Sequence, residues 1–150
     1  MSIIKLVFAD DHQGFRTTVS DFLRRDGHIN VIAEAENGNE ALKFVRELSP
    51  DILLLDMRMP QLDGVGVSSS VRSENNNIKV LAFSVYDDDE YVRGMYENGA
   101  AGYLLKGESP DTLLSVLTRI FQGEKSFFSH KIADKLRGWG YDFENRFAYA

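Results

Sequence analysis

Five polar residues stand at the ends of apolar segments of the sequence, and their types could together perform metal and phosphate chemistry. The segment "VFADD" ends in Asp10 and Asp11, and "ILLLD" ends in Asp56. Ser84 ends "VLAFS", and Lys106 directly follows "GYLL". Carboxylates are hard oxygen ligands that suit Mg²⁺, which keeps several waters for the oxygens of a phosphate. A lysine nearby would offset the repulsion between the acids, which otherwise raises their pKa values.

The apolar segments alternate with helical patterns along the chain. We expect short strands over 3–8, 29–35, 52–55, 78–84 and 101–105. Helices are expected after each of them, because apolar residues there recur every three or four positions; the last one should begin with Ser109 as its cap and Pro110 in its first turn. Such alternation predicts a parallel sheet with helices on both faces. Ligands of such sheets bind at the carboxyl ends of the strands, where the five polar residues should meet.

Each of these residues also has a purely structural explanation when it is taken alone. Asp10 or Asp11 could cap the helix that follows. Asp56 could be a turn residue, and a lone Lys106 would be an ordinary solvated surface group. What favours chemistry is the joint occurrence of these residue types at the ends of different strands.

Composition limits the class of protein. The chain has 150 residues, of which 43% are hydrophobic and 27% charged, which is typical of one globular domain with room for an appendage. Because it has no cysteine, disulfides, thiolate metal sites and cysteine nucleophiles are excluded. The net charge of −6, without a cluster of lysine and arginine, argues against tight DNA binding by this chain alone.

The sequence contains no apolar run near the roughly 20 residues that cross a bilayer. Its N-terminus, "MSIIKLVFAD", lacks the long apolar region of a signal peptide. We therefore expect a cytoplasmic protein without a membrane partner.

Four segments resemble the motifs of one family. They are "VFADDHQGFR" (7–16), "LLLDMRMPQLDG" (53–64), "LAFSVYDD" (81–88) and "GAAGYLLKGES" (99–109). In this order and spacing, over roughly residues 3 to 122, they resemble the receiver domain of two-component response regulators, and the last segment resembles the NarL/FixJ type. The resemblance implies an α/β fold with a doubly wound, five-stranded parallel sheet, flavodoxin-like (βα)5, in strand order 2-1-3-4-5.

The resemblance also implies roles for the acids. Asp56 would be the phosphoacceptor, a nucleophile toward the phosphorus of a phosphohistidine. Asp11 would bind Mg²⁺ directly and Asp10 through water. Asp56 itself and the backbone carbonyl of Arg58 would complete the protein ligands.

The remaining roles concern the phosphoryl group and the response to it. Lys106 would neutralise one phosphoryl oxygen, and the Ser84 hydroxyl and a backbone N–H near Met57 would bind others. Tyr103 would be an aromatic switch that turns inward once Ser84 moves. Tyr103 could instead be a half-exposed packing residue with no second state.

The resemblance implies a signalling protein and not an enzyme, apart from promoting its own phosphotransfer and dephosphorylation. Its partners would be a sensor histidine kinase or phosphotransfer protein, with a possible homodimer on phosphorylation. It would control transcription through a DNA-binding domain that is not in this chain. Two alternatives are a stand-alone receiver that acts by protein contacts and an aspartyl-phosphate phosphohydrolase on the same fold.

Two departures from the family pattern stand out. Many receivers have a proline, often in a cis bond, after the conserved lysine, where this chain has Gly107. A cis peptide there is doubtful, since a cis bond without proline costs about 3 kcal/mol. The usual threonine is replaced by Ser84, which keeps the hydroxyl.

The end of the chain is expected to be a separate unit. We expect the receiver over 1–122 and a linker or tail over 123–150, with a short helix at about 129–137 that Ser129 could cap. The segment "GEKSFFSHKIADKL" resembles the linker that leads to a LuxR-type DNA-binding domain in this family. In a stand-alone receiver, aromatic residues of the tail would pack on its own surface or on a partner, namely Trp139, Tyr141, Phe143, Phe147 and Tyr149.

Overall fold

A computed structural model describes residues 2–75 and 77–147. The strands are β1 (Ile4–Ala9), β2 (Ile29–Ala35), β3 (Ile52–Leu55), β4 (Lys79–Ser84), β5 (Gly102–Leu105) and β6 (Phe127–Phe128). The helices are α1 (Gln13–Arg25), α2 (Gly38–Leu48), α3 (Gly64–Glu74), α4 (Asp89–Glu97), α5 (Pro110–Phe121) and α6 (His130–Gly138). Among the described residues, no helix has both the length and the apolar character that a membrane span requires.

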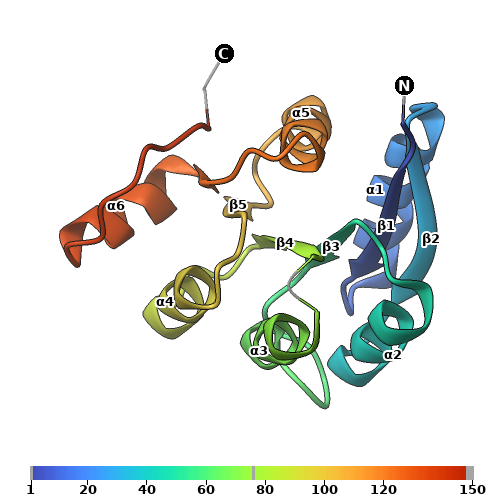
Figure 1. Ribbon diagram of the computed structural model, residues 1–150, viewed down its shortest axis with the longest axis horizontal. Coiled ribbons are helices and arrows are strands. Elements are labelled where there is room, and N and C mark those ends of the chain that lie inside the picture. Colours follow the sequence, from blue (N-terminus) through green and yellow to red (C-terminus); the bar gives the residue numbers. More distant parts are fainter. Residues whose placement is uncertain (1, 76, 148–150) are drawn as a thin grey trace.

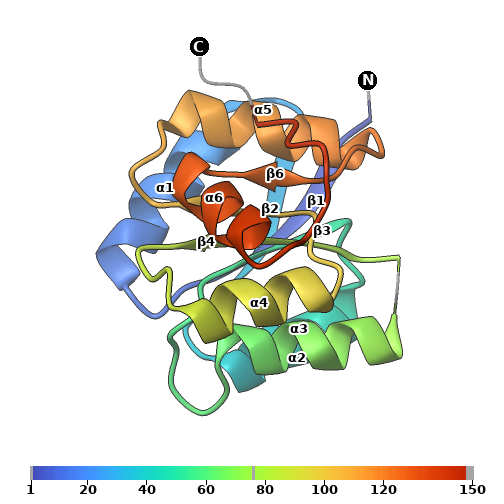
Figure 2. The same cartoon turned by 90° about the vertical axis from the view of Figure 1, so that its left-hand side faces the viewer.

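The strands form one parallel sheet in the order β2-β1-β3-β4-β5-β6. Helices α1 and α5 cover one face, and α2, α3 and α4 cover the other, with α6 packed beside α4 (Figures 1 and 2). All four residues of β3 are fully buried because both faces of the sheet are covered. This burial explains why the strand reads as an unbroken apolar run.

The expected alternation and the order of the first five strands are confirmed, but the count of five strands is wrong. The sixth strand, β6, comes from the tail and pairs in parallel with β5, Gly102 opposite Phe127 and Tyr103 opposite Phe128. Gly102 permits this approach, because a Cβ atom there would lie 2.2 Å from the carbonyl oxygen of Phe127. A strand of two residues has no periodicity that a sequence pattern could detect.

The capping residue is the expected one at α5 but a different one at α1. The Ser109 hydroxyl accepts a hydrogen bond from Thr112 N (3.1 Å) at the start of α5, as predicted. At α1, however, the cap is His12, whose Nδ1 accepts from Phe15 N (3.1 Å). The expectation that Asp10 or Asp11 caps α1 is therefore wrong, and neither acid serves as a helix cap.

Residues 123–147 fold back on the rest of the chain. Beyond α6 the chain returns along β6, where the Asn145 side chain accepts from Phe128 N (3.0 Å) and donates to Phe128 O (2.9 Å). Asn145 thereby satisfies the backbone groups that the outer edge of β6 would otherwise leave unpaired. The Tyr96 ring on α4 lies 4.5 Å from the Tyr141 ring and 5.9 Å from the Phe143 ring. Phe147 is also buried, whereas Tyr149 lies outside the described residues.

We expect Asn145→Ala to loosen the tail. The change removes both hydrogen bonds to Phe128, so the free energy of unfolding should fall by about 1 to 2 kcal/mol in urea denaturation. Limited proteolysis should then cut residues 139–147 earlier than in the parent. Asn30→Ala is the control, because Asn30 is exposed on β2 and its side chain has no hydrogen bond among the described residues. Equal stability and equal proteolysis of the two variants would contradict this account of the edge.

Candidate functional site

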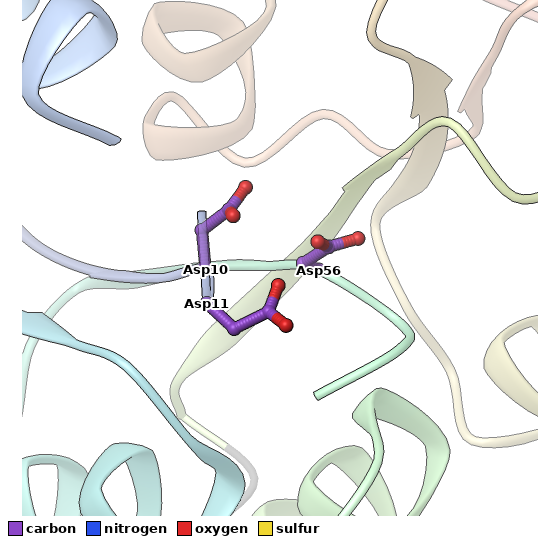
Figure 3. A group of neighbouring side chains, drawn as sticks. All are labelled: Asp10, Asp11 and Asp56. Atoms are coloured by element: carbon purple, nitrogen blue, oxygen red, sulfur yellow. The ribbon is translucent and has the colours of Figure 1, made fainter. Parts of the chain in front are cut away.

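Three carboxylates meet where β1 and β3 end. The two strands are neighbours with Ala9 opposite Leu55, and Asp56 N donates to Ala9 O (3.0 Å). Oxygens of Asp10, Asp11 and Asp56 lie within 4.8 Å of one another. Figure 3 shows the three side chains side by side, two from the end of β1 and one from the end of β3. The structure thus brings together the acids that the sequence placed at strand ends.

Lys106 lies between the two buried acids. Its Nζ is 2.7 Å from Asp10 Oδ2 and 3.3 Å from Asp56 Oδ2, and its side chain is only 10% exposed. The ring of Phe15 covers the ammonium group, 4.3 Å from its centroid. A single cation therefore offsets two carboxylates that are almost completely removed from water.

Asp56 is held by groups that also set its pKa. Met57 N donates to Asp56 Oδ1 (2.8 Å), whereas the expected bond from this N–H to a phosphoryl oxygen stays a prediction. Burial raises the pKa of the Asp56 carboxyl above its ordinary value, against the hydrogen bond from Ser84 and the charge of Lys106, which both act to lower the pKa. The nearby charge of Asp10 adds to the increase. The net direction is upward, so the ionised form of Asp56 is less stable here than that of an aspartate in water.

Ser84 and Tyr103 are joined through Tyr86. Tyr86 N donates to Ser84 Oγ (3.1 Å), and the Tyr103 hydroxyl donates to Tyr86 O. Tyr103 is 1% exposed, packed between α4 and the tail, so its description as half-exposed is wrong. Burial, with the charge of Asp56 second, raises the pKa of the Tyr103 phenol and keeps it protonated as a donor.

The Arg58 side chain points away from the acids. Its guanidinium stacks on the Tyr86 ring, 4.0 Å from the centroid, and lies 3.5 Å from a carboxylate oxygen of Asp88. This leaves the backbone of Arg58 as the part that could reach a metal, and the role of its carbonyl stays a prediction. The stack fixes the β4–α4 loop beside the acids.

Two glycines shape the loops around the acids. The Lys106–Gly107 bond is trans, since the described residues contain no cis peptide. A Cβ on Gly64 would lie 2.5 Å from the carbonyl oxygen of Asp56, so α3 can begin this close to the loop after β3 only with glycine there.

The acids open into a depression of ≈ 430 Å³ lined by Asp11, His12, Phe15, Asp56, Val85, Tyr86 and Lys106. Sequence reasoning missed Phe15, His12 and Tyr86 as members of the site. The signal that could have found Tyr86 is its place two residues after Ser84, in the loop that must pass the acids.

The residues fit a Mg²⁺ ion. All donors are oxygens, and Asp11 is exposed and lines the depression. Asp10 Oδ2 is buried without a hydrogen bond, since its contact with Lys106 has the distance of an ion pair but not the angle of a hydrogen bond. A buried acid oxygen with spare capacity beside two further acids is the donor set of a hard cation that keeps part of its water.

The raised pKa of Asp56 predicts how stability depends on pH. Its folded-state pKa lies above the unfolded value, so its contribution to stability is present at low pH and is lost as pH rises through the folded-state pKa. Asp56→Asn should therefore raise the free energy of unfolding at pH 7, on the order of 1 kcal/mol, and the gain should shrink on acidification. Urea denaturation between pH 4 and pH 8 checks this.

Asp51→Asn is the matched control, because Asp51 stands at the other end of the same strand and binds Lys5 N (2.8 Å). A stability gain in Asp56→Asn that does not change with pH, or a loss of stability at pH 7, would contradict the charge balance described for this site.

Comparison with known proteins agrees with this geometry. The protein-family model of the response regulator receiver domain matches residues 6–118 of the chain. The chain is 36% identical over 120 residues to the transcriptional regulatory protein DegU of Brevibacillus brevis, covering 80% of this chain and 51% of that protein. It is 36% identical over 122 residues to the oxygen regulatory protein NreC of Staphylococcus aureus, covering 81% of this chain and 56% of that protein. The chain thus spans about half the length of these relatives.

Among solved structures, the signal receiver domain of a NarL response regulator from Mycobacterium tuberculosis superposes with a TM-score of 0.78 at 35% identity, covering 83% of this chain and 100% of that chain. The acids, the lysine and the strand order lie in the part of the chain that these comparisons cover. The chain belongs to the response regulators of two-component systems, as a receiver domain whose relatives include transcriptional regulators.

Proposed function

We propose that the chain accepts a phosphoryl group on Asp56 and that this modification changes the surface formed by α4, β5 and α5. The observation that carries the proposal is the position of Asp56. It is 2% exposed, yet lines the depression, and one of its carboxylate oxygens faces Lys106 at 3.3 Å. An acid held in this way is poised to react with an incoming phosphoryl group.

In the proposed step, a carboxylate oxygen of Asp56 attacks the phosphorus of a phosphohistidine in line with the leaving nitrogen. The new O–P bond forms as the P–N bond breaks, and the imidazole leaves with the electron pair of that bond. Lys106 offsets the charge of one phosphoryl oxygen, and Ser84 and the N–H of Met57 donate hydrogen bonds to others. The same groups would favour attack by water on the acyl phosphate, which gives the chain a slow self-dephosphorylation.

Asp11 would hold Mg²⁺ directly, Asp10 through water, and Asp56 and the carbonyl of Arg58 would complete the set. When bound, the ion supplies positive charge that offsets the carboxylates and the phosphoryl oxygens. The chain's own contribution is to converge these oxygens from two adjacent strands before the ion arrives. This reduces the reorganisation that binding requires.

The phosphoryl group would act at a distance through Ser84 and Tyr103. A hydroxyl drawn toward the phosphoryl oxygens would release or strain its bond to Tyr86 N, and Tyr86 O is the acceptor of the Tyr103 hydroxyl. The buried Tyr103 ring would then repack against α4 and the tail. This would shift the equilibrium between two conformations of the surface formed by α4, β5 and α5.

The partners follow from this proposal. A sensor histidine kinase or a phosphotransfer protein would supply the phosphoryl group, and a second copy of the chain could bind the altered surface. Residues 1–122 would be the signalling unit and 123–150 its tail. Relatives such as DegU are named as transcriptional regulators, so the output we propose is control of transcription through a DNA-binding domain outside this chain.

Neither alternative gains support. Tyr141, Phe143 and Phe147 pack against the chain itself, which is one of the two placements expected of a stand-alone receiver, so these residues do not support an output through a partner bound to the tail. A phosphohydrolase would need a general acid, and the acids beside Asp56 among the described residues, Asp10 and Asp11, are the ones proposed to hold Mg²⁺.

Phosphorylation of Asp56 is the first test. Incubation with acetyl phosphate and Mg²⁺ should add one phosphoryl group, seen by intact mass, and hydroxylamine should remove it. Asp56→Asn should reduce labelling at least 100-fold, because an amide is not a nucleophile at this pH. Asp51→Asn should label like the parent. Labelling of the Asp56→Asn variant at the parent's level would remove Asp56 from this role.

Metal binding is the second test. Asp11→Ala removes an oxygen donor from the cluster, so Mg²⁺ affinity measured by calorimetry should fall at least 10-fold. Asp21→Ala is the control, since Asp21 is an exposed acid on α1 without an ion pair among the described residues. If both variants bind Mg²⁺ like the parent, the acid cluster is not the metal site.

Signal transmission is the third test. With Mg²⁺ present, the phosphoryl mimic beryllofluoride should shift amide NMR signals at the acids and also at Tyr91–Tyr96 and Tyr103–Leu105. Ser84→Ala should shrink the remote shifts more than it weakens binding of the mimic, because it breaks the link to Tyr86. If only the amides near the acids respond in the parent, the site binds without switching.

A further inference from the structure

Ser129 occupies the cap position of α6 but does not cap the helix. Serine at this position ordinarily accepts a hydrogen bond from a backbone N–H two or three residues later. At α6 no side-chain cap bond is made, in contrast to Ser109 at α5. The Ser129 residue is only 2% exposed, so its hydroxyl must be satisfied elsewhere.

The hydroxyl is used on the β5–α5 loop instead. Ser129 Oγ accepts from Leu105 N (2.9 Å) and donates to Glu108 Oε2 (2.7 Å). It therefore joins the residue before Lys106 to the residue two positions after it. A second bond, from Ser129 N to Tyr103 O (3.1 Å), fixes the serine itself to β5.

The loop between these two contacts needs such a restraint. Gly107 follows Lys106 through a trans peptide, and a Cβ added to Gly107 would meet nothing within 4 Å. No close approach therefore demands glycine there, and glycine adds backbone freedom directly beside the lysine. On the other side, Lys106 N donates to Ser84 O (3.0 Å), and Glu108 N donates to Leu105 O (3.1 Å) across the loop, so Ser129 reinforces a turn that has a backbone hydrogen bond of its own.

We infer that Ser129, a tail residue, is a positioning residue for Lys106: it closes the loop 105–108 and so fixes the lysine at the distance that a phosphoryl oxygen on Asp56 requires. The inference rests on the proposed function of Asp56 and Lys106. It makes the tail a structural part of the phosphoryl-binding site, although Ser129 touches neither the acids nor the phosphoryl group.

Loss of the Ser129 hydroxyl would change the position of Lys106. Lys106 Nζ reaches two acid oxygens, at 2.7 and 3.3 Å, from a backbone that Ser129 restrains. Without the Ser129 hydroxyl, Leu105 N and the Glu108 carboxylate lose their shared partner, and the glycine allows the loop to sample other conformations. The lysine then spends part of its time away from the phosphoryl position, which weakens binding there.

The test compares beryllofluoride binding by the full chain at saturating Mg²⁺, measured by calorimetry. Ser129→Ala should raise Kd on the order of 3- to 10-fold, because both hydrogen bonds of its hydroxyl are lost and the lysine is held less firmly. Ser109→Ala is the matched control, because it removes a serine hydroxyl that caps α5 from the same loop without bonding to residues 105–108. It should lower stability but leave the Kd of beryllofluoride within 2-fold of the parent.

A variant cycle separates positioning from general destabilisation. In a Lys106→Ala background, Ser129→Ala should cause no further rise in Kd, whereas its loss of stability in urea should persist. An equal fold-change in both backgrounds, or the same change in Ser109→Ala, would show that Ser129 acts only on overall stability, and would overturn the inference.

If Ser129→Ala does not fold, Glu108→Ala is a second variant that tests the same contact. It removes the acceptor of the Ser129 hydroxyl from a partly exposed position, and should weaken beryllofluoride binding in the parent but not in the Lys106→Ala background. A Kd unchanged by Glu108→Ala overturns the inference. Failure of the parent itself to bind beryllofluoride would refute the proposed function, and this inference with it, whereas equal binding by parent and Ser129→Ala would refute this inference alone.

Discussion

The arrangement of this protein depends on one charge balance, in which the ammonium group of Lys106 faces two carboxylates that are almost fully buried. Burying an ionised group is costly unless it is paired. Asp10 and Asp56 share Lys106 at 2.7 and 3.3 Å, and the pKa of Asp56 is still raised by its burial. The site is thus left with negative charge that a divalent cation would offset.

The scaffold holds this balance by presenting each group from a rigid element. Parallel neighbours β1 and β3 end side by side, and β3 is buried along its whole length, so Asp56 cannot withdraw. Lys106 stands on a loop that contains a glycine, where backbone hydrogen bonds join Lys106 N to Ser84 O and Glu108 N to Leu105 O. The tail adds support, through β6 on the edge of the sheet and Ser129 on the loop. The tail and the site are therefore parts of one structure.

The fold was predictable because its apolar residues recur with strong periodicity. The acid cluster was predictable because carboxylates stand at the ends of the expected strands. The strands Ile29–Ala35 and Ile52–Leu55 have the bounds expected from their apolar runs, and the acids after β1 and β3 meet because these strands are parallel neighbours. By contrast, β6 is too short to show a pattern, and it forms only because Gly102 lets Phe127 approach. The use of Ser129 was also unpredictable, since the sequence offers a cap serine and only the three-dimensional contacts reveal its other partners.

The charge balance can be measured most directly by a ¹³C NMR pH titration of the Asp56 side-chain carboxyl, with and without Mg²⁺ and in Lys106→Ala. The account predicts a midpoint above the value of about 3.9 that is ordinary for aspartate, a further rise when the lysine is removed, and a fall when Mg²⁺ is added. A midpoint at or below the ordinary value that responds to neither the lysine nor the metal would contradict it.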